Sequence, residues 1–254
     1  MRAKFEPMTD SQWQFTKEFL NTDRKRKHDL RLIFDAIRWV NKTGLQWREL
    51  EQTIFPKWQI TYYYFRKWKK QGVIFSMLRA IVKLERVRQN REEEPSMGAI
   101  DSQSVKKGMF VSDDTGIDGN KKVNGRKRHI LTDSLGLPIT ISVTAANVYD
   151  GNEGKNLIKK IQDVTYRLTL IRADDTYKGS FVDEAKTLGY DVEFGQKPES
   201  TKGFVPQKGR WQVERSFAWL NPFRRLSKDY EKTKESSVTF IELAFLDILL
   251  GRIP

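Results

Sequence analysis

The spacing of apolar residues changes at residues 91–96, and this change constrains the fold more than any other feature. Before it, apolar residues recur at helical spacing, most clearly over residues 30–40. After it, short runs rich in β-branched residues predict strands at 97–102, 125–133, 137–145, 168–173 and 190–194. The intervening segment is charged and contains Pro95, which is typical of a linker. We therefore predict two domains, residues 1–92 and 97–254.

The order of the predicted elements indicates the fold class. In the second domain a meander of strands is followed by alternating helices and strands, which predicts an α/β fold with a mixed sheet flanked by helices. A ribonuclease H-like fold has this order of elements. The first domain is predicted to be all-helical, with residues 58–70 as the recognition helix of a helix-turn-helix-like arrangement.

The charge of the chain indicates its partner. Lys and Arg number 46 against 33 Asp and Glu, a net charge of +13 that calls for a polyanion or a membrane surface. No apolar run approaches the roughly 20 residues of a membrane span, and the start lacks the apolar segment of a signal peptide. The chain has no cysteine, which is compatible with a reducing cytoplasm. Nucleic acid is therefore the expected partner, with no membrane.

Three acidic residues are the candidate catalytic groups. Asp101 and Asp174 each end a predicted strand, and Glu214 lies at the start of an aromatic-rich helix. A lone aspartate at a strand end is usually a turn former, but two of them with Glu214 favour an all-oxygen site for Mg²⁺ or Mn²⁺. Two such ions activate water and stabilise the leaving oxygen in phosphodiester cleavage. Asp175 is the alternative to Asp174, because adjacent strand residues face opposite ways.

Basic residues form two candidate DNA-binding surfaces. On the predicted recognition helix, Tyr63, Arg66, Lys67 and Lys70 are expected to face DNA; the alternative is an amphipathic helix whose lysines cover apolar surface. In the second domain, a hairpin is expected to contact phosphate rather than only water. Its basic residues are Lys121, Lys122, Arg126, Lys127 and Arg128.

The helix that carries Glu214 adds two further basic residues. Arg210 and Arg225 lie on the face of Glu214 and are expected to grip the scissile strand; the alternative is a structural ion pair. The loop at residues 24–28 is expected to touch backbone phosphate at most. His129 is not expected to bind metal.

Several segments resemble a known family. Residues 99–106, 125–138, 145–150, 173–179, 210–220 and 223–226 are similar to the DDE transposases of bacterial insertion sequences, above all to the insertion-sequence-five family. Residues 43–50 and 58–68 resemble the helical DNA-binding region of that family. The resemblance implies a ribonuclease H-like catalytic domain, an acidic triad at Asp101, Asp174 and Glu214, and divalent metal. It further implies cleavage and strand transfer at transposon ends.

The resemblance also leaves positions and functions open. Gln207 and Asn221 stand where the wider superfamily often has Tyr and Lys, so no role is carried over to them. Because two element ends are handled together, a homodimer on DNA is expected, in the bacterial cytoplasm. The alternative functions are a metal-dependent nuclease without strand transfer and a non-catalytic DNA-binding regulator.

Overall fold

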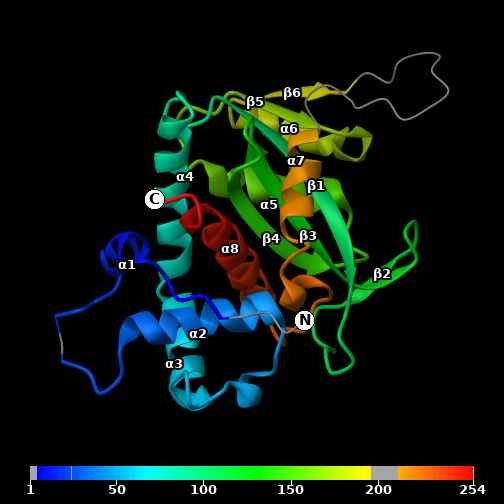
Figure 1. Cartoon of the computed structure of the whole chain (residues 1–254). Coiled ribbons are helices and arrows are strands. Elements are labelled where there is room, and N and C mark those ends of the chain that lie inside the picture. Colours follow the sequence, from blue (N-terminus) through cyan, green and yellow to red (C-terminus); the bar gives the residue numbers. More distant parts are fainter. Residues whose placement is uncertain (1–4, 24, 196–210, 254) are drawn as a thin grey trace. The chain divides into compact units, whose positions relative to one another are not determined.

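The structure, a computed structural model, describes residues 5–23, 25–195 and 211–253 (Figure 1). The chain divides into two compact units, each built from several segments. The first comprises Met1–Ile81, Leu220–Ser227 and Glu235–Pro254, and the second comprises Val82–Trp219 and Lys228–Lys234. The helices are α1 (Asp10–Lys17), α2 (Leu30–Thr43), α3 (Trp58–Lys70), α4 (Val73–Arg88), α5 (Asp150–Ile161), α6 (Ser180–Thr187), α7 (Trp211–Trp219) and α8 (Lys234–Leu250). The strands are β1 (Met97–Lys106), β2 (Gly116–Asp118), β3 (Val123–Asp133), β4 (Pro138–Ala145), β5 (Leu170–Ala173) and β6 (Asp191–Phe194).

The sheet of the second unit has the connectivity of a ribonuclease H-like fold. Its strands β1, β3 and β4 form an antiparallel meander, and β5 and β6 follow as parallel strands on the other edge of β1. The order across the sheet is therefore β4-β3-β1-β5-β6, with the short β2 paired to the start of β3. The predicted fold class, an α/β mixed sheet flanked by helices, is confirmed.

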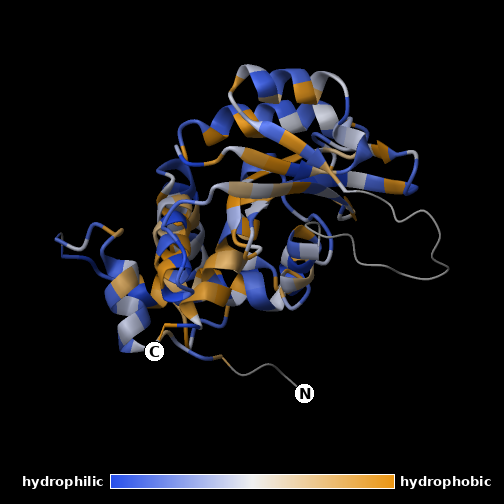
Figure 2. Ribbon diagram, turned by 90° about the horizontal axis from the view of Figure 1, so that it is seen from above, coloured by the Kyte–Doolittle hydropathy of each residue, from blue (hydrophilic) through white to orange (hydrophobic). Residues whose placement is uncertain are grey.

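Helices cover both faces of this sheet. On one face α5 and α6 bury an apolar cluster that includes Ile100 of β1, Leu131 of β3 and Ile171 of β5. On the other face α7 packs against β1 and β3 (Figure 1). Figure 2 shows polar and apolar residues mixed along these helices, as expected where one helix face lies on a sheet and the other meets water.

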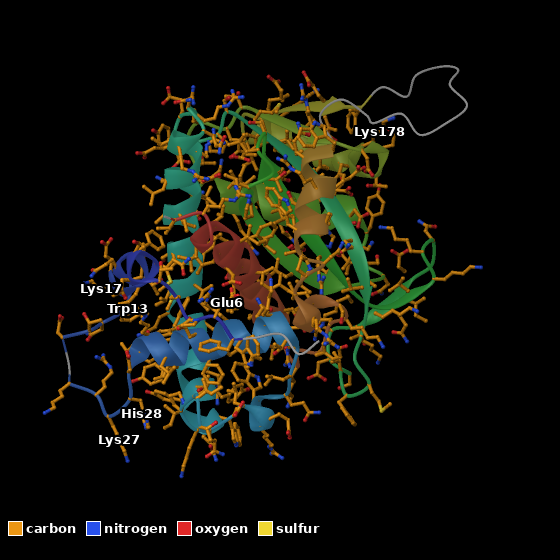
Figure 3. The ribbon with its side chains drawn as sticks, viewed as in Figure 1. Glu6, Trp13, Lys17, Lys27, His28 and Lys178 are labelled. Atoms are coloured by element: carbon orange, nitrogen blue, oxygen red, sulfur yellow. The ribbon has the colours of Figure 1, made fainter. Side chains whose placement is uncertain are left out.

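The helices of the first unit begin and end at residues that suit those positions. Thr9 and Gln12 form a capping box at the start of α1, whose Trp13 and Lys17 are labelled in Figure 3. Asp29 accepts a hydrogen bond from the backbone N–H of Arg31 at the start of α2. The helix ends at Gly44, which has a φ of 71° that glycine tolerates best.

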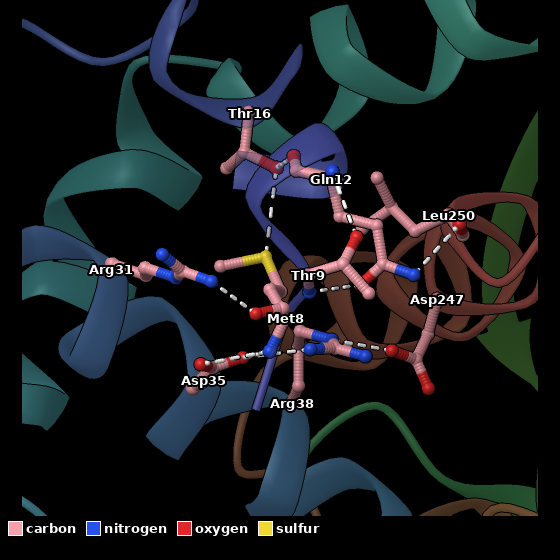
Figure 4. A network of polar contacts seen from close by, with 9 residues as sticks. All are labelled: Met8, Thr9, Gln12, Thr16, Arg31, Asp35, Arg38, Asp247 and Leu250. Atoms are coloured by element: carbon pink, nitrogen blue, oxygen red, sulfur yellow. Dashed lines mark hydrogen bonds and ion pairs between the residues drawn. The ribbon is translucent and has the colours of Figure 1, made fainter. Parts of the chain in front are cut away.

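A polar network ties the N-terminal segment to helices α2 and α8 (Figure 4). The backbone N–H of Met8 donates to the Asp35 carboxylate at 3.2 Å, and Arg38 bridges Asp35 and Asp247. Burial raises the pKa of Asp35, and the neighbouring Arg38 opposes that shift. The side chain of Gln12 donates to the carbonyl oxygen of Leu250 at 3.1 Å.

The C-terminal helix α8 belongs to the first unit, which differs from the predicted division of the chain at residues 92–97. Phe240 of α8 stacks on Phe65 of α3 with 4.8 Å between the ring centroids. Asn41 of α2 donates to the carbonyl oxygen of Phe240 at 3.1 Å. Because α8 is apolar on nearly every face, it is buried among other helices rather than laid on a sheet. The functions assigned to the two predicted domains stay predictions.

Candidate active site and nucleic-acid interface

Asp101 and Asp174 belong to neighbouring segments of the sheet. Strands β1 and β5 are parallel neighbours in which Gly98 pairs with Ile171 and Ala99 with Arg172. The pairing ends there, and Asp174 directly follows β5 whereas Asp101 lies within β1. Continued by two residues, the same register would bring Asp101 opposite Asp174, although the two are 73 positions apart in the sequence.

Both aspartates face the side of the sheet that α7 covers. Ile100, Ile171 and Ala173 point into the apolar cluster under α5 and α6. Side chains alternate along a strand, and the backbone of Asp174 is still extended, with φ −93° and ψ 179°. Asp101 and Asp174 therefore lie on the opposite face from that cluster.

Asp175 lies outside this arrangement. It begins a short 3₁₀ turn, η2 (Asp175–Tyr177), where strand alternation has ended. Its side chain is exposed and forms an ion pair with Lys178 at 2.9 Å. The geometry thus favours Asp174 over Asp175 as the partner of Asp101.

Local hydrogen bonds hold both carboxylates. Asp101 accepts from the backbone N–H of Ser102 at 2.7 Å. Asp174 accepts from the backbone N–H of Thr176 at 2.9 Å and from the Thr176 hydroxyl, so it also caps the 3₁₀ turn η2. Asp174 is therefore a turn-forming residue in addition to being a candidate ligand.

Glu214 lies on α7, which packs against the same face of the sheet. The buried residues of α7 are Gln212, Val213, Ser216 and Phe217. At 100° per residue, Glu214 falls on one exposed flank of the helix and Arg215 on the other. Arg215 donates to the carbonyl oxygen of Leu135 in the β3–β4 turn, so the Glu214 flank is the one turned away from that turn.

The acidic residues offer the oxygen ligands that a hard cation prefers. The register supplies two carboxylates on one face, and α7 supplies a third on the helix that covers it. In the part of the chain that the structure describes, however, no three acidic or histidine side chains lie close enough together to hold a metal ion. The arrangement of Asp101 and Asp174 is compatible with a shared cation, and both the binding of metal and the closure of Glu214 onto that pair stay predictions.

Arg215 anchors α7, a role that the sequence analysis missed. Its guanidinium lies 4.4 Å from the ring centroid of Trp211 and 5.0 Å from that of Trp219. The helix is also held at Gly136, whose carbonyl oxygen accepts from the Ser216 hydroxyl at 2.6 Å. The sequence contained a signal for this stacking, because Trp211, Arg215 and Trp219 follow one another at four-residue intervals and such residues share a helix face.

The structure corrects the predicted role of Arg126. Its side chain is fully buried rather than turned to solvent. It forms an ion pair with Asp229 at 3.1 Å and donates to the carbonyl oxygens of Asp113 and Glu231, each at 2.8 Å. A guanidinium with these partners is not available to DNA phosphate, so the prediction for Arg126 is wrong.

Lys127 and Arg128 are buried as well, and the same correction applies. Lys127 donates to the carbonyl oxygen of Val148 at 2.9 Å and pairs with Asp150 at 2.8 Å. Burial lowers the pKa of Arg128 to about 10, because the charged form loses its hydration. The physical reason is that β3 lies between β1 and β4, while residues 113 and 229–231 cover Arg126 and residues 148–150 cover Lys127.

His129 is buried, whereas Lys121 and Lys122 on the nearby turn are exposed, and their contact with DNA stays a prediction. Burial lowers the pKa of His129 to about 4, and its Nε2 lies 2.9 Å from the Thr144 hydroxyl. Lys121 and Lys122 are exposed at the β2–β3 turn. The Lys121 ammonium lies 3.5 Å from the carbonyl oxygen of Ser102, next to Asp101, so this lysine is near the candidate site.

Helix α3 presents the predicted aromatic and basic face. Phe65 and Trp68 are buried in the helical core, whereas Tyr63 is 57% exposed and Arg66 and Lys70 are also exposed. Lys67 is half-buried, with its ammonium 5.9 Å from the Tyr64 ring centroid. These contacts are compatible with a DNA-facing helix surface, and DNA contact stays a prediction.

A cavity of about 550 Å³ lies beside this face of α3. Its walls come from α3 and from residues 25–28, of which Lys27 and His28 are labelled in Figure 3. Both walls contribute basic side chains, including Lys25, Arg26 and Lys67. The loop thus adds positive charge next to the predicted recognition surface.

Two further predicted DNA contacts, Arg225 and Arg210, remain. Arg225 is half-buried, donates to the carbonyl oxygen of Leu45 at 3.3 Å and lies 5.3 Å from the Phe240 ring centroid. It therefore has a packing role within the first unit. Arg210 and Gln207 lie outside the described residues. No described helix is long and apolar enough to cross a bilayer.

A ribonuclease H-like sheet with two aligned aspartates defines a class of candidate nucleic-acid enzymes, and comparisons with known proteins specify the family. Residues 92–246 match the family described as "Transposase DDE domain", and residues 8–78 match "Putative transposase of IS4/5 family". The first match covers more than half of the chain. The chain therefore belongs to the DDE transposase family of insertion sequences.

A curated relative agrees with this assignment. The chain is 30% identical over 132 residues to a "Putative transposase for insertion sequence element IS402" from Burkholderia cepacia. The match covers 47% of this chain and 60% of the relative, so it spans less than two thirds of that protein's length.

Two solved structures that this chain matches have low sequence identity to it and low TM-scores. The Mos1 strand transfer complex is 11% identical, with 94% of this chain and 82% of that chain covered and a TM-score of 0.34. The piggyBac transposase synaptic complex with hairpin DNA is 13% identical, with 76% and 48% covered and a TM-score of 0.31. The fold assignment rests on the strand order of the sheet and not on these scores.

Proposed function

We propose that this chain is a DNA transposase that binds the terminal inverted repeats of an insertion sequence, cleaves at the element ends and transfers the 3′-hydroxyl strands into target DNA. The observation that supports the proposal is the register of β1 and β5, which pairs Ala99 with Arg172 and, continued by two residues, would bring Asp101 beside Asp174 on the face that α7 covers. Family membership supports it, because the matched region contains both strands and the helix of Glu214.

In this proposal Asp101, Asp174 and Glu214 are the ligands of two Mg²⁺ ions, for which Mn²⁺ substitutes. Bound divalent ions lower the pKa of a water nucleophile and stabilise the leaving oxygen. The protein would contribute the placement of these ligands: the sheet would hold two carboxylates side by side, and the hydrogen bonds of Arg215 and Ser216 hold the helix that bears the third. Three carboxylates in one place repel one another, which favours the bound over the empty site.

DNA binding is assigned to two surfaces. Tyr63, Arg66, Lys67 and Lys70 of α3 would recognise the element ends, with the loop at residues 25–28 contacting backbone phosphate. Lys121 and Lys122 would hold the strand near Asp101. A homodimer on DNA would handle both ends, and the site of action would be the bacterial cytoplasm.

Cleavage and joining of labelled end DNA into a plasmid, in Mg²⁺, tests the proposal. Asp174→Asn is expected to lower end cleavage by at least about 10³-fold, since the loss of a metal ligand removes most of the transition-state stabilisation. Asp175→Asn is the matched control and is expected to keep cleavage within a few-fold of the unmodified chain. Joined products are expected only with intact Asp101 and Asp174.

Three outcomes would contradict parts of this account. Cutting without joining would identify the chain as a metal-dependent nuclease. DNA binding without cutting would identify a regulator. Loss of cleavage in Asp175→Asn with full activity in Asp174→Asn would show that the register argument selects the wrong aspartate.

A further inference from the structure

Two large apolar side chains stand exposed at the tip of the loop that follows β1. Met109 is 90% exposed and Phe110 is 96% exposed, more than any other large hydrophobic side chain of the described residues. Tyr230, 43% exposed, packs beside the loop at Gly108. An apolar patch bare to water is unfavourable in the free protein, so it points to a partner that covers it.

The base of this loop is held rigidly although its tip is bare. The backbone N–H of Gly108 donates to the carbonyl oxygen of Asp229 at 2.6 Å. The backbone N–H of Asp229 donates to the carbonyl oxygen of Lys106 at 2.9 Å. A Cβ atom on Gly108 would lie 2.9 Å from the Tyr230 ring, so the backbone passes too close for a larger residue. The tip is therefore presented at a fixed place.

The buried Arg126 clamps the far end of the same loop. Its guanidinium donates to the carbonyl oxygens of Asp113 and Asp114 on the loop and of Glu231 on the segment beneath it. Lys234 adds an ion pair to Asp114 at 3.2 Å. A fully buried arginine, which the proposed catalysis does not use, thus serves to hold the loop in place.

The charge around the tip of the loop favours DNA as its partner. Lys106 is exposed at the base of the loop, and Lys228 and Lys232 are exposed on the segment that hydrogen-bonds to it, so these three cations outnumber the exposed acids of the loop, Asp113 and Asp114. The loop continues the strand that carries Asp101. Five strand residues separate Asp101 from Lys106, roughly 17 Å, or about five base pairs along a duplex.

We propose that Met109 and Phe110 form a wedge that inserts between neighbouring base pairs of the bound DNA, several base pairs from the scissile phosphate. Apolar side chains in this position unstack a base step and bend the duplex, and burial of the two side chains offsets the cost of unstacking. The bend would bring the scissile strand toward the face of Asp101 and Asp174. The inference rests on the proposed function, because it requires element-end DNA as the ligand.

Fluorescence of 2-aminopurine tests the wedge. The base is placed at one position at a time over about ten base pairs on either side of the cleavage position, in a duplex that carries the inverted repeat flanking the coding region. With the full chain, one or two adjacent positions are expected to brighten at least about threefold on binding. The double variant Met109→Ala with Phe110→Ala is expected to abolish the rise, and Phe110→Trp is expected to retain it.

Tyr166→Ala is the matched control. Tyr166 is 89% exposed but precedes β5, so it lies toward the opposite end of that strand from Asp174. This variant is expected to leave the fluorescence rise unchanged. Thermal melting of each variant tests whether it is folded. The melting temperature is expected to be unchanged, because removal of an exposed side chain disturbs no buried contact.

The outcomes separate the wedge from the proposed function. Tight end binding by the unmodified chain without a rise at any position would overturn the wedge and leave the transposase proposal intact. Failure of the unmodified chain to bind the end DNA would overturn the proposed function and the wedge with it. A rise that persists in the double variant, together with a changed oligomeric state, would show that the tip contacts a second copy of the chain instead.

Discussion

Two basic runs of similar composition have opposite environments in this protein. Arg126, Lys127 and Arg128 lie on β3 and are at most 7% exposed, with partners inside the protein. Arg66 and Lys70 lie on α3 with their side chains in solvent. The comparison teaches that a run of positive charge indicates a nucleic-acid surface only where the secondary structure leaves one face of the element open.

The difference follows from the neighbours of each element. Strand β3 pairs with β1 on one edge and with β4 on the other, and helices cover both faces of the sheet. Its basic side chains therefore need internal partners, which Asp229 and Asp150 supply. Helix α3 buries Phe65 and Trp68 and leaves the opposite side to solvent.

Replacement of Arg126 is expected to give the largest effect on stability. Arg126→Gln leaves the buried Asp229 carboxylate without its cation, which is expected to lower the free energy of unfolding by about 3–5 kcal/mol. Lys122→Gln, on the exposed turn of the same basic region, is the matched control and is expected to change it by less than about 0.5 kcal/mol. Urea denaturation measures both. Equal, small effects would mean that the buried ion pair contributes little and that the two runs do not differ as described.

Acidification is expected to give the next largest effect, through His129. Its pKa is about 4 in the folded chain against an ordinary value of 6.5, so the unfolded chain binds the proton more readily. The contribution of His129 to the free energy of unfolding is therefore fully present above pH 6.5. It is lost as the pH falls toward 4, by about 3 kcal/mol in total. Denaturation midpoints across that range measure the loss.

A variant isolates the histidine from the other titrating groups. His129→Leu is expected to flatten the part of the pH profile between 4 and 6.5, whereas His28→Leu is expected to leave the profile unchanged, because His28 is partly exposed and lies on a loop. A profile that keeps its full slope in His129→Leu would show that another group is responsible.

Replacements on α3 are expected to change stability least and DNA binding most selectively. Arg66→Gln and Lys70→Gln remove exposed charges, so the free energy of unfolding is expected to change by less than about 0.5 kcal/mol. If each contacts one phosphate, each lowers the slope of log affinity against log salt by about 1. Binding to end DNA at several salt concentrations measures the slope, and an unchanged slope would remove these residues from the interface.

The sequence predicted features that depend on local pattern. The alternation of side chains and the position of Asp174 directly after a strand follow from the order of apolar residues. The predicted end of the first strand at Asp101 is wrong, because β1 continues to Lys106 and pairs with β3 along that length. The alternation of side chains along a strand indicated that only one of Asp174 and Asp175 can face the site, and the choice of Asp174 stays a prediction.

Features that depend on distant packing were not predictable in this way. The burial of Arg126 requires Asp229, which lies 103 positions away and shows no local signal. The position of α8 in the first unit arises because its apolar surface is buried among other helices, such as around Phe65 and Asn41. Both outcomes depend on which segments meet, and periodicity along the chain does not contain that information.

Cleavage of the polypeptide by bound iron tests the central claim, that Asp101, Asp174 and Glu214 converge on one divalent-metal site. Fe²⁺ replaces Mg²⁺ in an all-oxygen site, and with ascorbate and peroxide it generates radicals that cut the backbone nearby. Fragments ending near residues 101, 174 and 214, suppressed by excess Mg²⁺ and lost in Asp101→Asn, are the predicted result. Cuts elsewhere, or cuts near 101 and 174 without any near 214, would contradict the three-carboxylate site.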